Sequence, residues 1–292
     1  FESVSGFTTT GATILNDIEA LPQGLLFWRS ATAWIGGVGV VMFALVILPS
    51  LGTNKMALSS VELSSVAKDD YRYRTQIIVR ILLTVYVGLT AITTMLLKLA
   101  GMRWFDALNH AMSACATGGF STKNASIGFY DSPVIELILM AAMILASIHF
   151  GLIYATFARK SNNIFRSEVV RTYFSIIAVC VVAIAISIYA AGIYPTVWSS
   201  FRQSAFQFVS VISTTGFATA DTNLWTPFAI VLLIFGSIIC ACAGSTSGGI
   251  KVNRLILFAK VFAARLKLQQ HPNAVIRIRV DLSLIHISEP TR

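Results

Sequence analysis

Long apolar runs separated by short polar stretches dominate this 292-residue chain. Four of these runs approach or exceed the roughly 20 residues with which an α-helix crosses a bilayer, and a fifth begins at Pro227. Because the runs are continuous rather than alternating between apolar and polar residues, they favour helices over a β-barrel. The predicted membrane helices are Leu25–Leu48, Ile77–Leu97, Val134–Phe157, Tyr173–Ile193 and Pro227–Cys242.

Two further predicted helices are too short to cross a membrane. The half-apolar segments Trp104–Cys115 and Thr196–Val211 each follow a break at glycine or proline, and each leads into a polar turn. The fifth apolar run is interrupted at Gly244–Gly249, and a more basic helix resumes at Ile250. Non-helical backbone at membrane depth is tolerated only where it lines a cavity or is buried in protein. The pattern therefore predicts an all-α membrane protein in which short pore helices support polar turns.

A threonine-rich turn that contains glycine occurs three times, about every hundred residues along the chain. Backbone carbonyls and threonine hydroxyls in such turns replace the hydration shell of a cation without adding a net charge, and glycine permits the backbone angles required. A hard cation prefers these oxygen ligands. The candidate cation-binding residues are Thr9, Thr10, Gly11, Thr117, Gly118, Gly119, Thr214, Thr215 and Gly216.

Composition and charge agree with a membrane protein. Only 12% of the residues are charged and 55% are hydrophobic, whereas a soluble domain carries roughly 25% charged residues. The positive-inside rule explains the net charge of +9 better than nucleic-acid binding does, because Lys and Arg gather in particular loops. The turns are then expected to face outward. Acids near them form either an ordinary solvated rim or a ring that concentrates cations: Asp17, Glu19, Asp106, Asp131 and Asp221.

The motifs of catalysis are incomplete in this sequence. Gly37-Val38-Gly39 lacks the glycine at position 42 that a dinucleotide fingerprint requires. His110 and His149 lie in predicted apolar helices and are expected to be satisfied core residues rather than ligands. The four cysteines lack the spacing of a zinc site and are expected to be small buried apolar residues. We expect no enzyme activity, no catalytic residue and no organic cofactor.

Four stretches together resemble the Trk/Ktr/HKT superfamily of potassium transporters, and most closely its TrkH-type subunits: residues 5–13, 116–122, 213–219 and 242–251. The resemblance extends from Glu2 to about Arg279. It implies four hairpins around one pore with pseudo-fourfold symmetry, in the bacterial cytoplasmic membrane. It also implies that potassium is bound by the backbone carbonyls of the candidate residues named above. In the superfamily, serine at the first filter glycine accompanies sodium transport, so Gly11 favours potassium.

The resemblance further implies a gate and partners. The interruption in the fifth run resembles an intramembrane loop that lies beneath the filter and gates the pore. Lys251 either approaches the pore from inside or is a snorkelling lysine at a helix end. The implied partners are membrane lipid, a second copy in a homodimer and a cytoplasmic nucleotide-binding regulatory subunit of the TrkA type. The candidate gate residues are Gly244, Ser245, Thr246, Ser247, Gly248, Gly249 and Lys251.

The repeats suggest a division of the chain. Compared with the superfamily, helices before the first turn and a fourth hairpin are expected to be missing, and we expect the piece not to conduct alone. The predicted units are a partial first repeat (1–75), a second repeat (76–171), a third repeat with a broken second helix (172–268), the start of a linker (269–281) and a tail that resembles non-native sequence (282–292).

Two other classes of function remain open. A secondary transporter of another fold, with a midplane site in a broken helix, suits the interrupted fifth run but not parallel repeats. A membrane scaffold or receptor without transport leaves the glycine turns without a purpose. Within the transport hypothesis, a channel and a cation-coupled symporter use the same filter.

Overall fold

The computed structural model describes residues 1–42, 75–157, 164, 167–270, 278–280 and 283–285. Helices make up most of this part of the chain, as expected. The helices are α1 (Glu2–Phe7), α2 (Gln23–Met42), α5 (Thr75–Leu99), α6 (Trp104–Cys115), η3 (Ser126–Tyr130), α7 (Pro133–Ala146), α8 (Phe150–Phe157), α9 (Glu168–Ala190), α10 (Val197–Ile212), η5 (Thr222–Leu224), α11 (Pro227–Ile238) and α12 (Val252–Gln270). Two short strand pairs are β1 (Ile239–Cys240) with β2 (Ile250–Lys251), parallel, and β3 (Ile278–Val280) with β4 (Ser283–Ile285), antiparallel.

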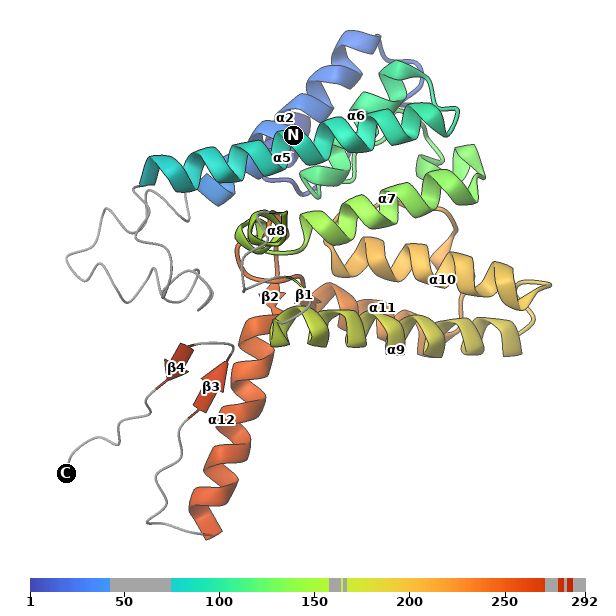
Figure 1. Cartoon of the computed structure of the whole chain (residues 1–292). Helices are drawn as coiled ribbons and strands as arrows, with labels where there is room; N and C mark the ends of the chain where they lie inside the picture. Colours follow the sequence, from blue (N-terminus) through green and yellow to red (C-terminus); the bar gives the residue numbers. More distant parts are fainter. Residues whose placement is uncertain (43–74, 158–163, 165–166, 271–277, 281–282, 286–292) are drawn as a thin grey trace.

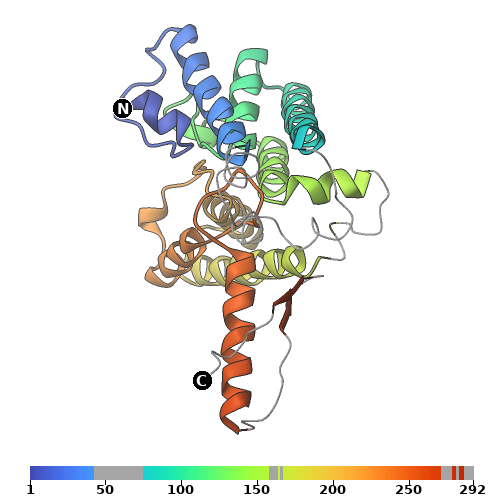
Figure 2. The ribbon, with the colours of Figure 1, turned by 90° about the vertical axis from the view of Figure 1, so that its left-hand side faces the viewer.

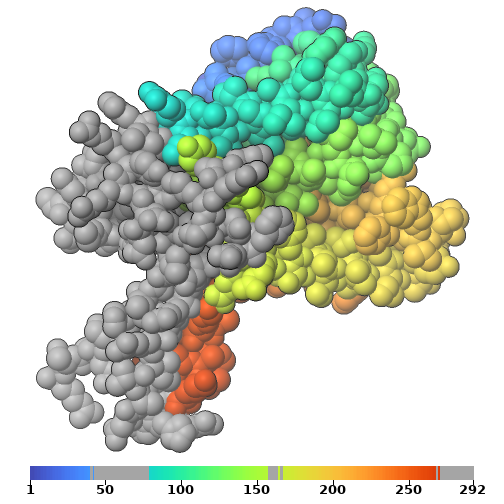
Figure 3. All heavy atoms as spheres, viewed as in Figure 1, coloured from blue at the N-terminus to red at the C-terminus, as the bar shows by residue number. Residues whose placement is uncertain are grey.

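The helices stack in layers, and α10 lies between α7 and α9. Helices α1, α2, α5 and α6 pack together at one end, α7 and α10 pack in the middle, and α9 and α11 pack at the other end (Figure 1). The space-filling view shows the same succession on the surface (Figure 3). Proline and threonine define several helix starts: Pro133 and Pro227 stand in the first turns of α7 and α11, and the Thr226 hydroxyl accepts a hydrogen bond from Ala229 N. In both the second and the third repeat, a long helix is followed by a short helix, a turn and another helix.

Two of the described helices are long and apolar enough to cross a membrane without a break. They are Val79–Leu99 and Glu168–Ala190, which correspond to two of the predicted spans. Helix α2 covers the first part of the predicted span Leu25–Leu48, whose last six residues lie outside the described residues. The short helix predicted at Trp104–Cys115 matches α6, and the one predicted at Thr196–Val211 matches α10 within one residue at each end.

The predicted helix Val134–Phe157 is not continuous. Helix α7 ends at Ala146, and α8 leaves at an angle of 105° (Figure 1). The break, which we call the elbow, comprises Ser147, Ile148 and His149. Here the Ser147 carbonyl accepts a hydrogen bond from Cys242 N, 3.0 Å away and in the third repeat. In a continuous helix this carbonyl would instead accept from an amide of the next helical turn. His149 Nδ1 then accepts from Gly151 N and so satisfies a free amide at the start of α8.

The fifth run also breaks earlier than predicted. Helix α11 ends at Ile238 rather than at Cys242, and the next two residues form β1. The chain then loops through 241–249, returns as β2 beside β1, and continues as α12, which extends away from the bundle (Figure 2). The parallel pairing of Ile239 with Ile250 thus closes the base of the loop. Strand β4 falls within the predicted tail, and residues 286–292 lie outside the described residues.

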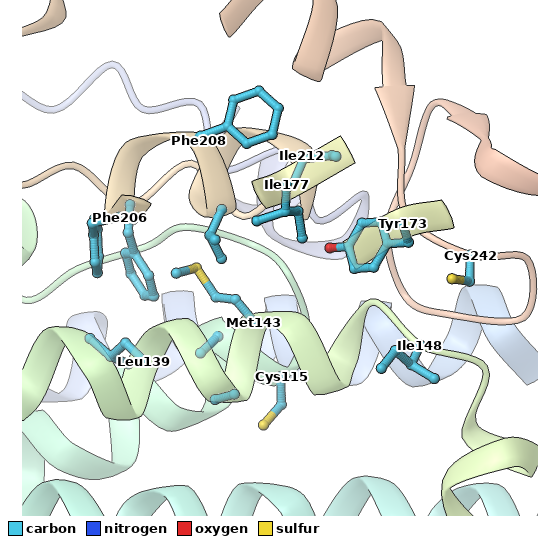
Figure 4. Packing of buried hydrophobic residues seen from close by; sticks show 14 of the residues in the cluster. Cys115, Leu139, Met143, Ile148, Tyr173, Ile177, Phe206, Phe208, Ile212 and Cys242 are labelled. Atoms are coloured by element: carbon cyan, nitrogen blue, oxygen red, sulfur yellow. The ribbon is translucent and has the colours of Figure 1, made fainter. Parts of the chain in front are cut away.

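A single large apolar cluster joins the second and third repeats. Leu139 and Met143 of α7, Phe206 and Ile212 of α10 and Ile177 of α9 lie together in it (Figure 4). All are at most 9% exposed. Cys115 and Cys242 belong to the same cluster, and all four cysteines are buried and free, as predicted. The core therefore fixes the short helix α10 against α7 and α9.

Candidate functional site

The three glycine turns have the same backbone conformation. A threonine with positive φ is followed two residues later by a glycine with positive φ, although a side chain makes the left-handed region unfavourable. Such strained residues persist where the surrounding structure over-determines them, which is common at functional sites. The φ angles are 54°, 54° and 58° at Thr9, Thr117 and Thr214, and 71°, 72° and 84° at Gly11, Gly119 and Gly216.

The turns contact one another through glycine and a main-chain carbonyl. A Cβ on Gly11 would lie 2.1 Å from Gly118 O, and a Cβ on Gly119 would lie 2.1 Å from Thr215 O. Each contact joins the glycine of one turn to a carbonyl of the next turn, and this carbonyl belongs to the residue directly before the next glycine. A Cβ on Gly216 would meet no described atom within 4 Å. The three predicted turns are therefore brought together side by side.

Each turn is held by the helix that precedes it. The amide of the residue after the left-handed threonine donates to a serine carbonyl near the end of that helix: Thr10 N to Ser5 O at 2.9 Å, Gly118 N to Ser113 O at 2.9 Å and Thr215 N to Ser210 O at 3.0 Å. Helices α1, α6 and α10 thus direct their carboxyl ends toward the turns. The negative end of the helix dipole favours a cation there.

Most of the threonine hydroxyls in the turns already have protein partners. The hydroxyls of Thr10 and Thr215 lie 2.8 Å from those of Thr8 and Ser213, respectively. Thr214 Oγ1 accepts from Gly248 N at 3.1 Å, and Thr117 Oγ1 donates to Ala116 O. Each of these hydroxyls therefore bonds within the protein, in its own turn or to the glycine-rich segment near residue 248.

The glycine-rich segment 244–249, which we call the gate loop, lies against the turns. Besides the bond from Gly248 N to Thr214, Thr246 Oγ1 donates to Cys115 O, 3.2 Å away, at the end of α6. Lys251 Nζ donates to Ser247 O and lies 3.5 Å from Ser245 Oγ, so its ammonium group bonds back into the gate loop. The structure thus brings together the predicted turns and the predicted gate residues.

The elbow fastens the gate loop from the other side. Ser147 Oγ lies 3.3 Å from Ser247 Oγ, in addition to the bond between Ser147 O and Cys242 N. The imidazole of His149 packs against Gly244, where an added Cβ would lie 2.3 Å from His149 Cδ2. The prediction that His149 lies inside a helix is therefore wrong, because His149 lies at the elbow. No pattern in the sequence marks Ser147 or His149 as a contact of the gate loop.

The acids near the turns are mostly paired. Lys123 Nζ lies 3.0 Å from Glu19, and Arg202 lies 2.9 Å from Asp131. The hydrogen bond from Lys123 holds the pKa of Glu19 below its ordinary value, and a hydrogen bond from Asn124 does the same for the pKa of Asp17. These pairs favour a solvated rim over an uncompensated anionic ring.

Asp106 does not belong to the outer rim. Its side chain is 3% exposed, pairs with Arg103 and accepts a hydrogen bond from Thr122, so the prediction that it lines the outer face is wrong. His110 is satisfied by Asp106 O and Ser121 Oγ, in agreement with the prediction. Among the described residues no group of three or more His, Cys, Asp or Glu is arranged to hold a metal ion.

A bundle of apolar helices whose short helices present glycine turns to one another is typical of an integral membrane protein. The chain belongs to the TrkH family of cation transport proteins, whose family model matches residues 1–286. This confirms the family expected from the four motif stretches and a multi-pass protein of the bacterial cytoplasmic membrane. It also agrees with a transport protein rather than an enzyme.

Individual relatives support the assignment. The chain is 37% identical over 283 residues to the Trk system potassium uptake protein TrkH of Halomonas elongata, and 37% identical over 282 residues to that of Escherichia coli K12. Each match covers 96% of this chain and 58% of the relative. The crystal structure of the potassium transporter TrkH from Vibrio parahaemolyticus matches with a TM-score of 0.83 at 34% identity, covering 96% of this chain and 57% of that one. This likeness opposes a transporter of another fold. The chain thus spans less than two thirds of the length of these relatives.

Proposed function

We propose that the protein takes up potassium across the cytoplasmic membrane through a filter of backbone carbonyls. The carbonyls of residues 9–11, 117–119 and 214–216 replace the hydration shell of the ion. The observation that carries the proposal is the head-to-tail contact of the turns, Gly11 with Gly118 O and Gly119 with Thr215 O. Oxygens of similar field on adjoining turns let an ion enter without its water and leave again, because no fixed charge traps it.

We also propose a pseudo-fourfold arrangement, which the same contacts support. Gly11 and Gly119 each lie against a carbonyl of the next turn, and the space beside Gly216 is open among the described residues. In the proposed arrangement a fourth turn, outside the described residues, fills this space and closes the ring. The curated relatives, which are longer than this chain, are consistent with such an additional hairpin.

The gate loop is proposed to open and close the pore beneath the filter. Its bonds to Thr214 and Cys115 support a position directly under the turns. Glycine and serine in the middle of a span leave backbone that is able to move. Potassium is the substrate. The proposed partners are membrane lipid, a second copy of the protein and a cytoplasmic nucleotide-binding regulatory subunit.

Potassium-dependent growth of a transport-deficient bacterium that carries the gene tests the proposal. Alanine at Gly119 would clash with Thr215 O and adopt an unfavourable φ of 72°, so growth at low potassium should be lost. Gly88→Ala is the matched control, because a Cβ on Gly88 in α5 meets nothing within 4 Å. Undiminished growth of the Gly119 variant at normal protein levels would count against the filter.

A further inference from the structure

The short helices contact their turns through side chains that recur at fixed distances along the sequence. Counted back from the left-handed threonine, a serine stands at four residues: Ser5, Ser113 and Ser210. A polar residue stands at seven residues: Glu2, His110 and Gln207. Because intervals of three and four residues place side chains on one helix face, each helix presents this pair of groups to its own turn.

In the first and third repeats, the serine hydroxyl holds the far end of the turn. Ser5 Oγ donates to Ala12 O at 2.6 Å, and Ser210 Oγ donates to Phe217 O at 2.6 Å. Both acceptors belong to the residue that follows the filter glycine. The same serines accept an amide with their own carbonyls, from Thr10 N and Thr215 N. One residue thus binds the turn both before and after its glycine.

The residue seven positions before the left-handed threonine holds the segment that leads out of the turn. Glu2 Oε1 accepts from Ile14 N at 2.9 Å, His110 Nε2 lies 2.9 Å from Ser121 Oγ, and Gln207 Nε2 donates to Ala220 O at 2.8 Å. Each repeat thus has one such contact, and the group that makes it is a carboxylate, an imidazole or an amide. The outgoing segment is therefore held in each repeat.

The second repeat lacks the serine contact. Ser113 Oγ is buried and has no hydrogen-bond partner among the described residues. Instead, Asp106 Oδ1 accepts from Thr122 Oγ1 at 2.8 Å, and Gly118 packs against Ala33 of α2. Ser113 and Ser210 are both 0% exposed, so they differ in bonding but not in burial. This difference provides a control within the molecule.

We propose that Ser5 and Ser210 are positioning residues for ion selectivity. By holding the carbonyl after the glycine, they end the row of ion-facing carbonyls at Gly11 and Gly216 and fix the separation of the oxygens. The inference rests on the proposed filter function and names the groups that set its geometry. A filter that selects by the number and field of its oxygens loses discrimination when these oxygens are able to relax around a smaller ion.

The test measures potassium uptake and sodium uptake in vesicles that carry the full-length protein, and compares Ser5→Ala, Ser210→Ala and Ser113→Ala. We expect the potassium-to-sodium ratio to fall at least about fivefold in the first two variants, which is the effect of about one lost hydrogen bond. The ratio should stay at the wild-type value in Ser113→Ala. If a variant does not accumulate in the membrane, serine is replaced by cysteine, a weaker donor of similar size, and a smaller fall is expected.

Two results would overturn the inference: an unchanged ratio in both Ser5→Ala and Ser210→Ala, or an equal fall in all three variants, which would indicate a packing role. The outcome is separable from failure of the proposed function. If the wild-type protein itself takes up no potassium, the filter proposal fails. If it takes up potassium and only the ratios disagree, the positioning role fails alone.

Discussion

The filter turns and the gate loop are both glycine-rich and non-helical, but their glycines have different neighbours. Gly11 and Gly119 lie against main-chain carbonyls of the adjoining turn. Gly244 and Gly249 lie against side chains, the His149 imidazole and the Cys240 side chain. A carbonyl that is fixed by its own turn has no room to retreat, whereas a side chain is able to change rotamer. Under the proposed function, this difference suits a filter that keeps one geometry and a gate loop that repacks.

The largest expected effect comes from alanine at the filter glycines. Strain from the left-handed backbone alone costs roughly 1–3 kcal/mol at each site. We expect Gly11→Ala and Gly216→Ala to abolish potassium uptake equally, because in the proposed ring a fourth turn lies against Gly216 as Gly118 O lies against Gly11. Uptake measured with equal amounts of membrane protein decides this. A much milder effect of Gly216→Ala would contradict the fourth turn.

The second prediction concerns rescue. Gly244→Ala introduces a Cβ that would lie 2.3 Å from His149 Cδ2, and its φ of 75° adds about 1–2 kcal/mol of strain. The double variant with His149→Ala should recover part of the lost thermal stability, with a coupling of about 0.5–3 kcal/mol in a double-mutant cycle. Thr215→Ala should not rescue Gly119→Ala, because the contacting atom is a main-chain oxygen. Rescue in both pairs would remove the distinction between the two loops.

A smaller effect is expected from loosening the gate loop alone. Thr246→Val keeps the side-chain shape and removes the hydroxyl that donates to Cys115 O. If this bond holds the loop closed, basal potassium uptake should rise about fivefold, corresponding to about one hydrogen bond. Thr172→Val is a suitable control, since the Thr172 hydroxyl donates to Glu168 O within α9. Equal changes in the two variants would show a general loss of stability.

The smallest effect is expected at the outer rim. The pKa of Glu19 is lowered by the hydrogen bond from Lys123, so the unfolded carboxylate binds a proton more readily than the folded one. The contribution of this pair to stability is therefore present above the ordinary pKa of 4.5 and is lost as the pH falls through the lower folded value. Because Glu19 is exposed, Glu19→Gln should hardly change the melting temperature at neutral pH. A melting curve that loses its acid dependence entirely in this variant would contradict the minor role.

Much of the site was readable from local sequence. Helix α6 begins and ends where the prediction placed it, because Gly101 breaks the previous helix and a polar turn follows Cys115. The turns were found because glycine and threonine recur in the same order in each copy. Ser5, Ser113 and Ser210 were missed, although their constant distance from the left-handed threonine is a signal that the sequence carries.

Contacts between repeats were not readable in this way. The elbow follows an apolar run with no glycine or proline before Gly151, and its bend depends on Cys242, which lies about a hundred residues further along the chain. The early end of α11 likewise depends on the pairing of Ile239 with Ile250. A helix pattern describes bonds between neighbours four residues apart, so it does not report a carbonyl that is taken by a distant amide.

The sequence by itself determined the apolar helices, the short helices and the three turns, because each follows from composition and glycine placement within a few residues. Only the tertiary structure decided that the turns adjoin one another, that the gate loop bonds to the third turn and to the end of α6, and that the chain bends between α7 and α8 beside this loop. These features depend on which backbone groups meet across the packed repeats. The pattern of side chains along one helix does not determine which distant backbone groups contact each other.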